Sequence, residues 1–223
     1  MDNRMMDEVL EARRLSGYTL LRFVSGQILK VPSPLFKVLR LHVGDQVDVE
    51  AYRIKLAALA PEAAMERAAW LLKQRDYSSH VLGQKLSQVG YTEGVVQHVL
   101  AALQSHRYLD DERYARQLLQ RKKAGAGRRG LAQQLRQKGI PSSVAQQLLE
   151  EEHSPENELK TAILLLKKHL RGKNWTPEEI RRKGAAMLAR RGFGWDSVRA
   201  ALDQVLDDDS SLEGDFSMGD AFE

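Results

Sequence analysis

Apolar residues recur at helical spacing after Pro61, and one pattern of residues occurs three times along the chain. A glycine anchors each copy; these are Gly90, Gly139 and Gly192, which lie 49 and 53 residues apart. Repeats of this length are typical of stacked helical units, each too small to bury its own apolar face. The positions that accompany the anchors are Leu82, Leu86, Tyr91 and Val95; then Leu131, Leu135, Ile140 and Val144; then Gly184, Leu188, Phe193 and, one place late, Val198.

Each copy is predicted to form three helices around a small apolar centre. In the first copy, Pro61 suits the first turn of a helix whose buried stripe includes Ala64, Ala68, Leu71 and Leu72. Ser78 or Ser79 is suited to be the N-cap of the second helix, and Gly90 is suited to form its left-handed C-cap. Thr92 is expected to start the third helix. The expected helices of the other copies are 111–123, 128–137, 141–151, 155–170, 177–190 and 195–206.

The first 60 residues have a different pattern. Residues 1–16 are expected to be a poorly ordered or helical lead-in, and residues 18–24 and 27–31 are β-prone runs that predict a hairpin around Ser25-Gly26. Alternation over 46–52 predicts a further strand. We therefore expect a mainly α protein of tandem three-helix repeats with a small β-containing N-terminal segment. The expected parts are 1–60 (lead-in with hairpin), 61–110, 111–153 and 154–206 (three helical repeats), and 207–223 (acidic disordered tail).

Composition narrows the class of protein. The chain has 223 residues and no cysteine, which excludes disulfides, thiol catalysis and Cys-ligated zinc and fits a reducing cytoplasm. The first residues lack the profile of a signal peptide, and no apolar run is long enough to span a bilayer, so a cytoplasmic location is expected. Residues 207–223 hold seven acids and no Lys or Arg. The remaining 34 basic and 23 acidic residues give 1–206 a formal charge of +11.

Such a basic body with an acidic tail suggests a polyanionic partner for which the tail competes, or equally a solubilising end on an ordinary soluble protein. Few acids interleave between residues 113 and 138, and the basic clusters span two successive repeats. Clustered Lys and Arg bind phosphate backbones without reading sequence, although most such residues only form solvated helix faces. The candidate binding surface consists of Arg113, Arg116, Arg121, Lys122, Lys123, Arg128, Arg129, Arg136, Lys138, Lys167, Lys168, Arg181, Arg182 and Lys183.

Motifs for catalysis or cofactor binding are weak. Gly125 to Gly130 matches G-x-G-x-x-G, but a helical segment precedes it where a dinucleotide fingerprint needs a strand, so a helix-to-helix turn is favoured. Asp110-Asp111 stands at a helix start, where capping is favoured over a metal or acid–base role. The six histidines are scattered, and the sequence has no G-x-S-x-G or P-loop. We expect no enzyme activity, no metal and no cofactor.

One stretch carries a family resemblance. Tyr108-Leu-Asp-Asp-Glu-Arg-Tyr-Ala115, with Arg121, Gly127, Leu131, Leu135, Arg136 and Lys138-Gly139-Ile140, resembles the RecX family of bacterial modulators of the RecA recombinase. Ser78, Leu82, Lys85-Leu86 and Gly90-Tyr91 are similar to that family's first repeat, and the likeness covers about 63–206. Arg107 stands where the family pattern has a glycine, and the long acidic tail is outside that pattern.

The resemblance implies an elongated, curved array of three-helix repeats that lies along the groove of a RecA–DNA filament. It implies restraint of strand exchange, ATP hydrolysis and coprotease activity in recombination, DNA repair and the SOS response, without cofactor or catalytic residues. The alternative is a module that binds single- or double-stranded DNA directly. Backbone binding weakens steeply with salt, which distinguishes the two hypotheses. A monomer is expected in either case.

Overall fold

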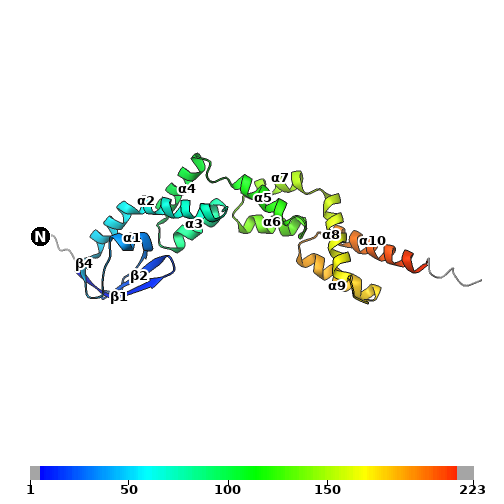
Figure 1. The fold of residues 1–223 in the computed structure, drawn as a ribbon, viewed down its shortest axis with the longest axis horizontal. Coiled ribbons are helices and arrows are strands. Elements are labelled where there is room, and N and C mark those ends of the chain that lie inside the picture. The colour runs from blue at the N-terminus through cyan, green and yellow to red at the C-terminus, as the bar shows by residue number, and fades with distance from the viewer. Residues whose placement is uncertain (1–5, 215–223) are drawn as a thin grey trace, which may run out of the picture. The chain divides into compact units, whose positions relative to one another are not determined.

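The computed structural model describes residues 6–214, and two compact units divide the chain after Asp111. Among the described residues, unit 1 holds four strands and helices α1 to α4, and unit 2 holds helices α5 to α10 (Figure 1). The protein is therefore mainly helical, with a small N-terminal sheet, as the sequence predicted. No helix within this range is both long and apolar enough to cross a membrane.

The sheet has four antiparallel strands in the order β3-β2-β1-β4. Strands β2 (Tyr18–Phe23) and β3 (Ile28–Pro32) form the predicted hairpin, with Leu20 opposite Lys30. Strand β1 (Met6–Leu15) corrects the expectation of a poorly ordered or helical lead-in. Asp7 and Val9 are buried on one face while charged residues occupy much of the other, and those charges obscured the two-residue period.

Helix α1 (Ser33–Val38) follows the hairpin, and strand β4 (Gln46–Asp48) is much shorter than the predicted 46–52 strand. Helix α2 (Val49–Gln74) begins at once, because the Asp48 carboxylate accepts a hydrogen bond from the Ala51 backbone N–H at 3.0 Å. The predicted helix start at Pro61 is wrong. The proline lies inside α2, where the buried stripe of Ala60, Ala64 and Ala68 continues past it. Packing of that stripe outweighs the loss of one helical hydrogen bond.

The repeats follow in order. Repeat 1 consists of α2, α3 (Ser79–Gln88) and α4 (Glu93–Ser105). Repeat 2 consists of α5 (Asp111–Lys122), α6 (Arg128–Gln137) and α7 (Ser142–Glu152). Repeat 3 consists of α8 (Pro155–Leu170), α9 (Pro177–Arg190) and α10 (Trp195–Gly214). The bounds of α6, α8 and α9 are those predicted from the sequence.

Helix α10 corrects the expected tail. It was predicted to end at 206 and to be followed by disorder, but it continues through 207–214, and residues 215–223 lie outside the described range. Val198, Leu202 and Val205 anchor the start of α10 in the core of repeat 3. Once a helix is nucleated in this way, each further residue adds a hydrogen bond at little cost.

One turn closes the second helix of every repeat. Gly90, Gly139 and Gly192 have φ values of 107°, 74° and 78°. The N–H of the following Tyr91, Ile140 or Phe193 donates to the carbonyl of Leu86, Leu135 or Leu188 at 3.1–3.3 Å, which is the Schellman arrangement. The equivalent residues after the turn are Val96, Ala145 and Val198, all buried, so the third copy is not one place late as the sequence suggested.

Arg107 closes α4 by the same device. It has a φ of 58°, and among the described residues it is the single non-glycine with a positive value. The N–H of Tyr108 donates to the Leu103 carbonyl at 2.9 Å. This backbone explains why a glycine suits the position before the Leu-Asp-Asp stretch.

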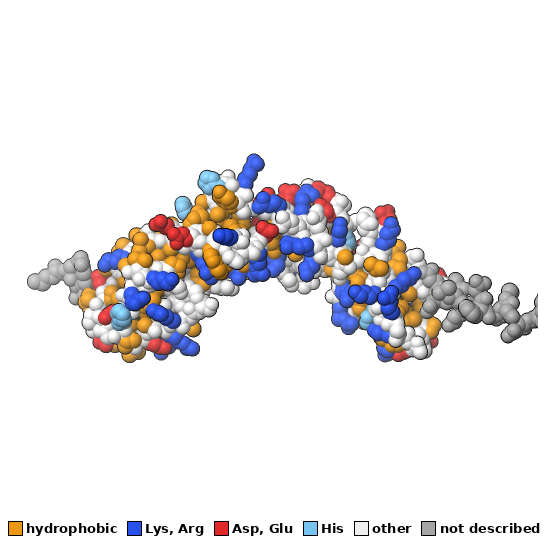
Figure 2. Space-filling view, in the orientation of Figure 1, with side chains coloured by type: hydrophobic (Ala, Val, Ile, Leu, Met, Phe, Trp, Pro, Cys, Tyr) orange, Lys and Arg blue, Asp and Glu red, His pale blue; other side chains and the backbone are white. Residues whose placement is uncertain are grey.

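Three apolar cores support these elements. The sheet and repeat 1 share one core, in which Phe23 and Leu21 of the hairpin are as fully buried as Leu82 and Leu86 of α3. Repeats 2 and 3 each have a core of their own, built around Leu131 and Leu135 in one and Leu166 and Leu188 in the other. Charged side chains lie on the surface around these cores, as Figure 2 shows.

Candidate functional site

A groove of about 480 Å³ runs between α6 and α7 of repeat 2. Leu131 and Leu135 turn one face of α6 into the core, so the neighbouring face of that helix forms a wall of the groove. No Asp or Glu lines it. We call it groove 2; its lining residues are Arg128, Arg129, Ala132, Gln133, Arg136, Ile140, Ser142, Ala145, Gln146 and Leu149.

The three arginines of groove 2 differ in their partners. The Arg128 backbone N–H donates to the buried Glu158 carboxylate at 2.9 Å, and its guanidinium contacts the Leu149 carbonyl and the Glu150 carboxylate, each at 3.4 Å. The side chains of Arg129 and Arg136 are exposed and have no ion pair or hydrogen bond to any residue of the described range. Groove 2 therefore presents two uncompensated guanidinium groups.

Repeat 1 has the same groove with different chemistry. This groove, called groove 1, has a volume of about 740 Å³ and lies between α3 and α4. Nine of the ten positions that line groove 2 are positions of groove 1 shifted by 49 residues, the spacing of Gly90 and Gly139. His80 stands in place of Arg129, Ser87 in place of Arg136, and Glu93 in place of Ser142. The repeat preserves the lining positions of the groove, while the size and the charge of the groove change.

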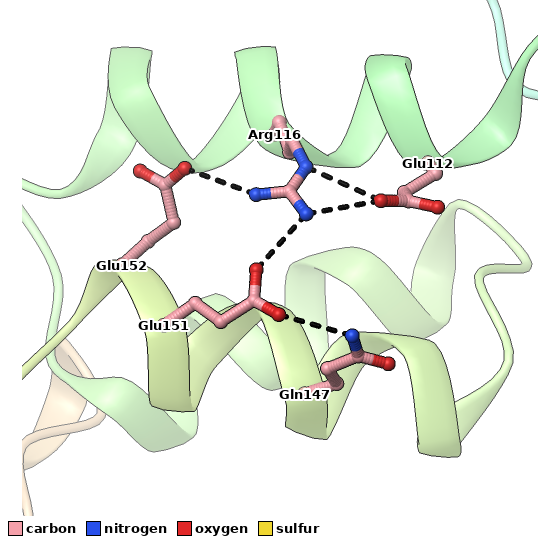
Figure 3. A network of polar contacts seen from close by, with 5 residues as sticks. All are labelled: Glu112, Arg116, Gln147, Glu151 and Glu152. Atoms are coloured by element: carbon pink, nitrogen blue, oxygen red, sulfur yellow. Dashed lines mark hydrogen bonds and ion pairs between the residues drawn. The ribbon is translucent and has the colours of Figure 1, made fainter.

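Arg116 on α5 is a structural residue of repeat 2 (Figure 3). Its guanidinium contacts Glu112 at 3.0 Å, Glu151 at 2.9 Å and Glu152 at 3.5 Å, which joins α5 to α7. The hydrogen bond that Arg116 donates to Glu112, followed by the one it donates to Glu151, raises the pKa of Arg116. Hydrogen bonds from Gln147 and then Arg116 lower the pKa of Glu151. Three carboxylates therefore surround the guanidinium of Arg116, a residue that the sequence suggested for the binding surface.

The remaining predicted cations of repeat 2 lie on its surface. Arg121, Lys122 and Lys123 are exposed at the C-terminal end of α5, where the Arg121 side chain donates to the Gln117 carbonyl at 3.2 Å. Arg113 is exposed on α5, and Lys138 is half-buried at the end of α6. Few acids interleave between residues 113 and 138 in the sequence, but acids from later helices reach Arg128. Glu150 of α7 contacts its guanidinium, and Glu158 of α8 accepts a hydrogen bond from its backbone N–H.

In repeat 3, two of the predicted residues are held by acids. Arg181 pairs with Asp203 at 2.8 Å. Lys183 pairs with Glu179 at 2.7 Å. Its Nζ atom lies 4.4 Å from the centre of the Trp175 ring, and the Nζ atom of Lys173 lies 4.3 Å from the same centre. The hydrogen bond from Lys183 lowers the pKa of Glu179. Lys167, Lys168, Arg181 and Arg182 are exposed, whereas Lys183 is half-buried.

The glycine-rich turn joins repeats 2 and 3. Gly127 N–H donates to the Arg191 carbonyl at 3.0 Å, and the N–H groups of Arg129 and Gly130 donate to the Gly192 carbonyl at 3.1 and 3.3 Å. A Cβ atom on Gly130 or Gly192 would clash with the backbone of the facing segment. Helix α5 precedes the turn, so the strand required by a dinucleotide site is absent from this motif. The glycines serve close backbone packing.

Asp111 is a helix cap, as expected, but it caps a different helix. Its carboxylate accepts a hydrogen bond from the backbone N–H of Ser79 at the start of α3, at 2.7 Å. Glu158 repeats this contact 47 residues later by accepting from the N–H of Arg128 at the start of α6. In both cases the acid follows the repeat whose second helix it caps. Sequence reasoning missed these contacts because acid and amide are 32 and 30 residues apart.

His153, at the C-terminal end of α7, is buried next to this contact. Its Nε2 atom has no hydrogen-bond partner among the described residues. Burial lowers the pKa of the imidazole, while the nearby Glu158 carboxylate acts in the opposite direction. Within the described range, no group of three or more His, Asp or Glu side chains is arranged to hold a metal ion.

Comparison with known proteins follows the same division into repeats. A family model described as RecX, second three-helix domain, matches residues 110–149. The chain is 33% identical to Regulatory protein RecX of Vibrio parahaemolyticus over 141 residues, which cover 63% of this chain and 90% of that protein. It is also 33% identical to Regulatory protein RecX of Halorhodospira halophila over 156 residues, covering 69% of this chain and 94% of that protein.

Two solved structures share the fold. One is a crystal structure of regulatory protein RecX, with a TM-score of 0.59 and 21% identity; the match covers 88% of this chain and 99% of that chain. The other is a crystal structure of RecX from Lactobacillus salivarius, with a TM-score of 0.59 and 17% identity; the match covers 66% of this chain and 97% of that chain.

Proposed function

This chain belongs to the RecX family of regulatory proteins, and from that premise we propose that it binds the RecA nucleoprotein filament and restrains it. In this proposal the chain acts without catalysis and without a cofactor, as a cytoplasmic monomer. It lowers ATP hydrolysis, strand exchange and coprotease activity of RecA, and so acts in recombination, DNA repair and the SOS response.

The observation that carries this proposal is the family relationship over most of the length of the relatives. The surface chemistry is consistent with it. Tandem helical repeats offer long surfaces suited to macromolecular partners. The exposed cations Lys122, Lys123, Arg129, Arg136 and Arg182 suit a polyanionic filament. Arg116, Arg128, Arg181 and Lys183 instead form ion pairs with acids of their own repeats.

A test of the proposal measures RecA-catalysed ATP hydrolysis on single-stranded DNA while this protein is added in increasing amounts. We expect suppression at less than one molecule per RecA subunit. Circular dichroism of the same preparation controls for folding. Unchanged hydrolysis with folded protein in excess would contradict the proposal.

Direct DNA binding is a second candidate function, favoured by the two uncompensated arginines of groove 2. Binding to RecA alone, DNA alone and the assembled filament at matched salt separates the two functions. A DNA-binding module loses affinity steeply as salt rises, because phosphates release counterions when they are neutralised. A regulator with a mixed protein interface retains more affinity for the filament than for bare DNA at the same salt.

A further inference from the structure

We infer that groove 2 binds the phosphates of a nucleic-acid strand, with Arg129 and Arg136 as the residues that contact them. This inference rests on the proposed function and deepens it, because it assigns one surface of the chain to the DNA of the filament. It starts from the two guanidinium groups that lack partners in the described part of the chain and share one groove.

The spacing of these arginines suits a strand of phosphates. They are seven residues apart on α6, which corresponds to two turns and about 10.5 Å along the helix. Each guanidinium offers a planar fork of donors that matches two phosphate oxygens. No carboxylate lines the groove to offset them. Two like charges held in one groove without an acid favour an anion that bridges them.

The rest of the lining combines polar side chains with small or buried apolar ones. Gln133, Ser142 and Gln146 add hydrogen-bonding groups, and the small side chains of Ala132 and Ala145 leave room for a backbone to approach. Ser142 is the first residue of α7, and no side chain caps this helix end, so its free N–H groups add positive potential to that of the arginines. These features suit phosphates.

Groove 2 lacks the features of base recognition and of a protein interface. No aromatic residue lines it, so stacked bases have no platform and binding is expected to be independent of sequence. Ile140 and Leu149 are buried, and no large apolar side chain is exposed as an anchor, whereas protein interfaces are centred on such anchors. A nucleic-acid strand is therefore favoured over an acidic polypeptide segment.

The experiment compares charge removal inside and outside the groove. The full chain carries either Arg129→Gln with Arg136→Gln, or the control pair Arg13→Gln with Arg14→Gln, which removes the same charge from exposed positions on β1, outside the candidate binding surface. Fluorescence anisotropy measures binding of labelled oligo(dT) and of a duplex between about 50 and 200 mM salt. Circular dichroism confirms that both variants fold.

We expect the groove pair to weaken binding about 10- to 30-fold at low salt. The slope of log K against log salt should become shallower by about 1.4 for the single strand or about 1.8 for the duplex, as two phosphate contacts are lost. The control pair should retain affinity within about threefold, since solvated cations outside a contact add only long-range attraction. Equal losses for both pairs, or no loss for the groove pair, would overturn the assignment.

Groove 1 supplies the converse test. In the wild-type chain, His80→Arg and Ser87→Arg place two arginines at the positions equivalent to Arg129 and Arg136, and Glu93→Ser removes the carboxylate that stands in place of Ser142. The salt slope should steepen by the same amount, because the wall positions of the two grooves correspond. An unchanged slope would show that this groove geometry with two arginines does not bind phosphates, which would also overturn the inference.

Binding to RecA alone and suppression of its ATP hydrolysis separate this inference from the proposed function. If the groove pair binds DNA like the wild type but no longer binds RecA alone, the occupant is an acidic polypeptide. The groove inference then falls while the regulator proposal stands. If groove 2 binds DNA as predicted but hydrolysis by RecA is unaffected, the regulator proposal falls and the groove inference stands.

Discussion

Gly192→Ala should disrupt the contact between repeats 2 and 3, and Gly172→Ala provides a matched control. Both glycines have left-handed backbone, with φ values of 78° and 73°. A Cβ atom on Gly172 meets no atom within 4 Å, whereas one on Gly192 clashes with the backbone N and Cα of Gly130. The two substitutions therefore share the conformational cost and differ only in the steric one.

The size of the effect follows from these contacts. A left-handed alanine costs about 1–2 kcal/mol, which is the whole expected effect of Gly172→Ala. In Gly192→Ala the turn must also move away from α6. This movement stretches three hydrogen bonds, from Gly127, Arg129 and Gly130, each of which contributes about 0.5–1.5 kcal/mol. The expected total is about 2.5–6.5 kcal/mol, a large share of the stability of a small unit.

Urea denaturation followed by tryptophan fluorescence measures this difference. A Trp70→Phe background leaves Trp175 and Trp195, both in repeat 3, as reporters. With a slope of about 2 kcal/mol per molar urea, Gly192→Ala should lower the midpoint by about 1.3–3.3 M and Gly172→Ala by about 0.5–1 M. Hydrogen exchange at the amide of Gly130 should accelerate only in Gly192→Ala. Equal midpoint shifts for the two variants would refute the argument.

Four further predictions concern other contacts. Asp111→Ala should destabilise unit 1 by about 0.5–2 kcal/mol through loss of the cap on Ser79, while the folded fraction still binds its partner; lost binding at unchanged melting temperature would argue for a contact role. Burial lowers the pKa of His153, so its contribution to stability should be fully present above pH 6.5, the ordinary pKa of histidine, and should be lost as the pH falls below that value. His153→Gln should therefore flatten the pH dependence of the free energy of unfolding, measured by denaturation from about pH 5 to 7.5. Arg116→Gln should lower the melting temperature of unit 2 and leave the salt slope of DNA binding unchanged, because three carboxylates already match its charge. Deleting 208–223 should raise affinity for DNA, most clearly at low salt, because a tethered acidic segment competes for the basic surface; weaker binding would show that the segment is itself a contact.

Local signals explain which elements the sequence predicted well. The bounds of α8 and α9 follow from a proline in the first turn and a Ser or Thr N-cap before it, all of which act within a few residues. The start of α2 and the strand β1 were missed for a different reason. Pro61 lies within a long helix whose packing outweighs its cost, and β1 owes its conformation to pairing with β2 and β4. Such tertiary support leaves little local trace.

The candidate surface shows the same limit. Composition and clustering identified the basic residues, but they did not separate the guanidinium of Arg116, held by acids, from the exposed one of Arg136. Glu152 on α7 pairs with Arg116 but is 36 residues away in the sequence, so no short sequence window around Arg116 includes it. The nearby Glu112, four residues earlier, was visible in the sequence and indicated a helix-surface pair.

The spacing of the repeats carries information that charge counts lack. The 49-residue offset first identified the apolar positions, and the same offset relates the walls of grooves 1 and 2. Core positions are constrained by packing, so both copies keep Leu at the two equivalent places, whereas exposed groove positions such as those of His80 and Arg129 are free to change charge. A difference confined to the groove positions, such as His80 against Arg129, therefore does not arise from the fold. It distinguishes the surface of repeat 2 from that of repeat 1 on the same scaffold, and it places the search for a binding site on α6 rather than on α5 or α9, which hold more Lys and Arg.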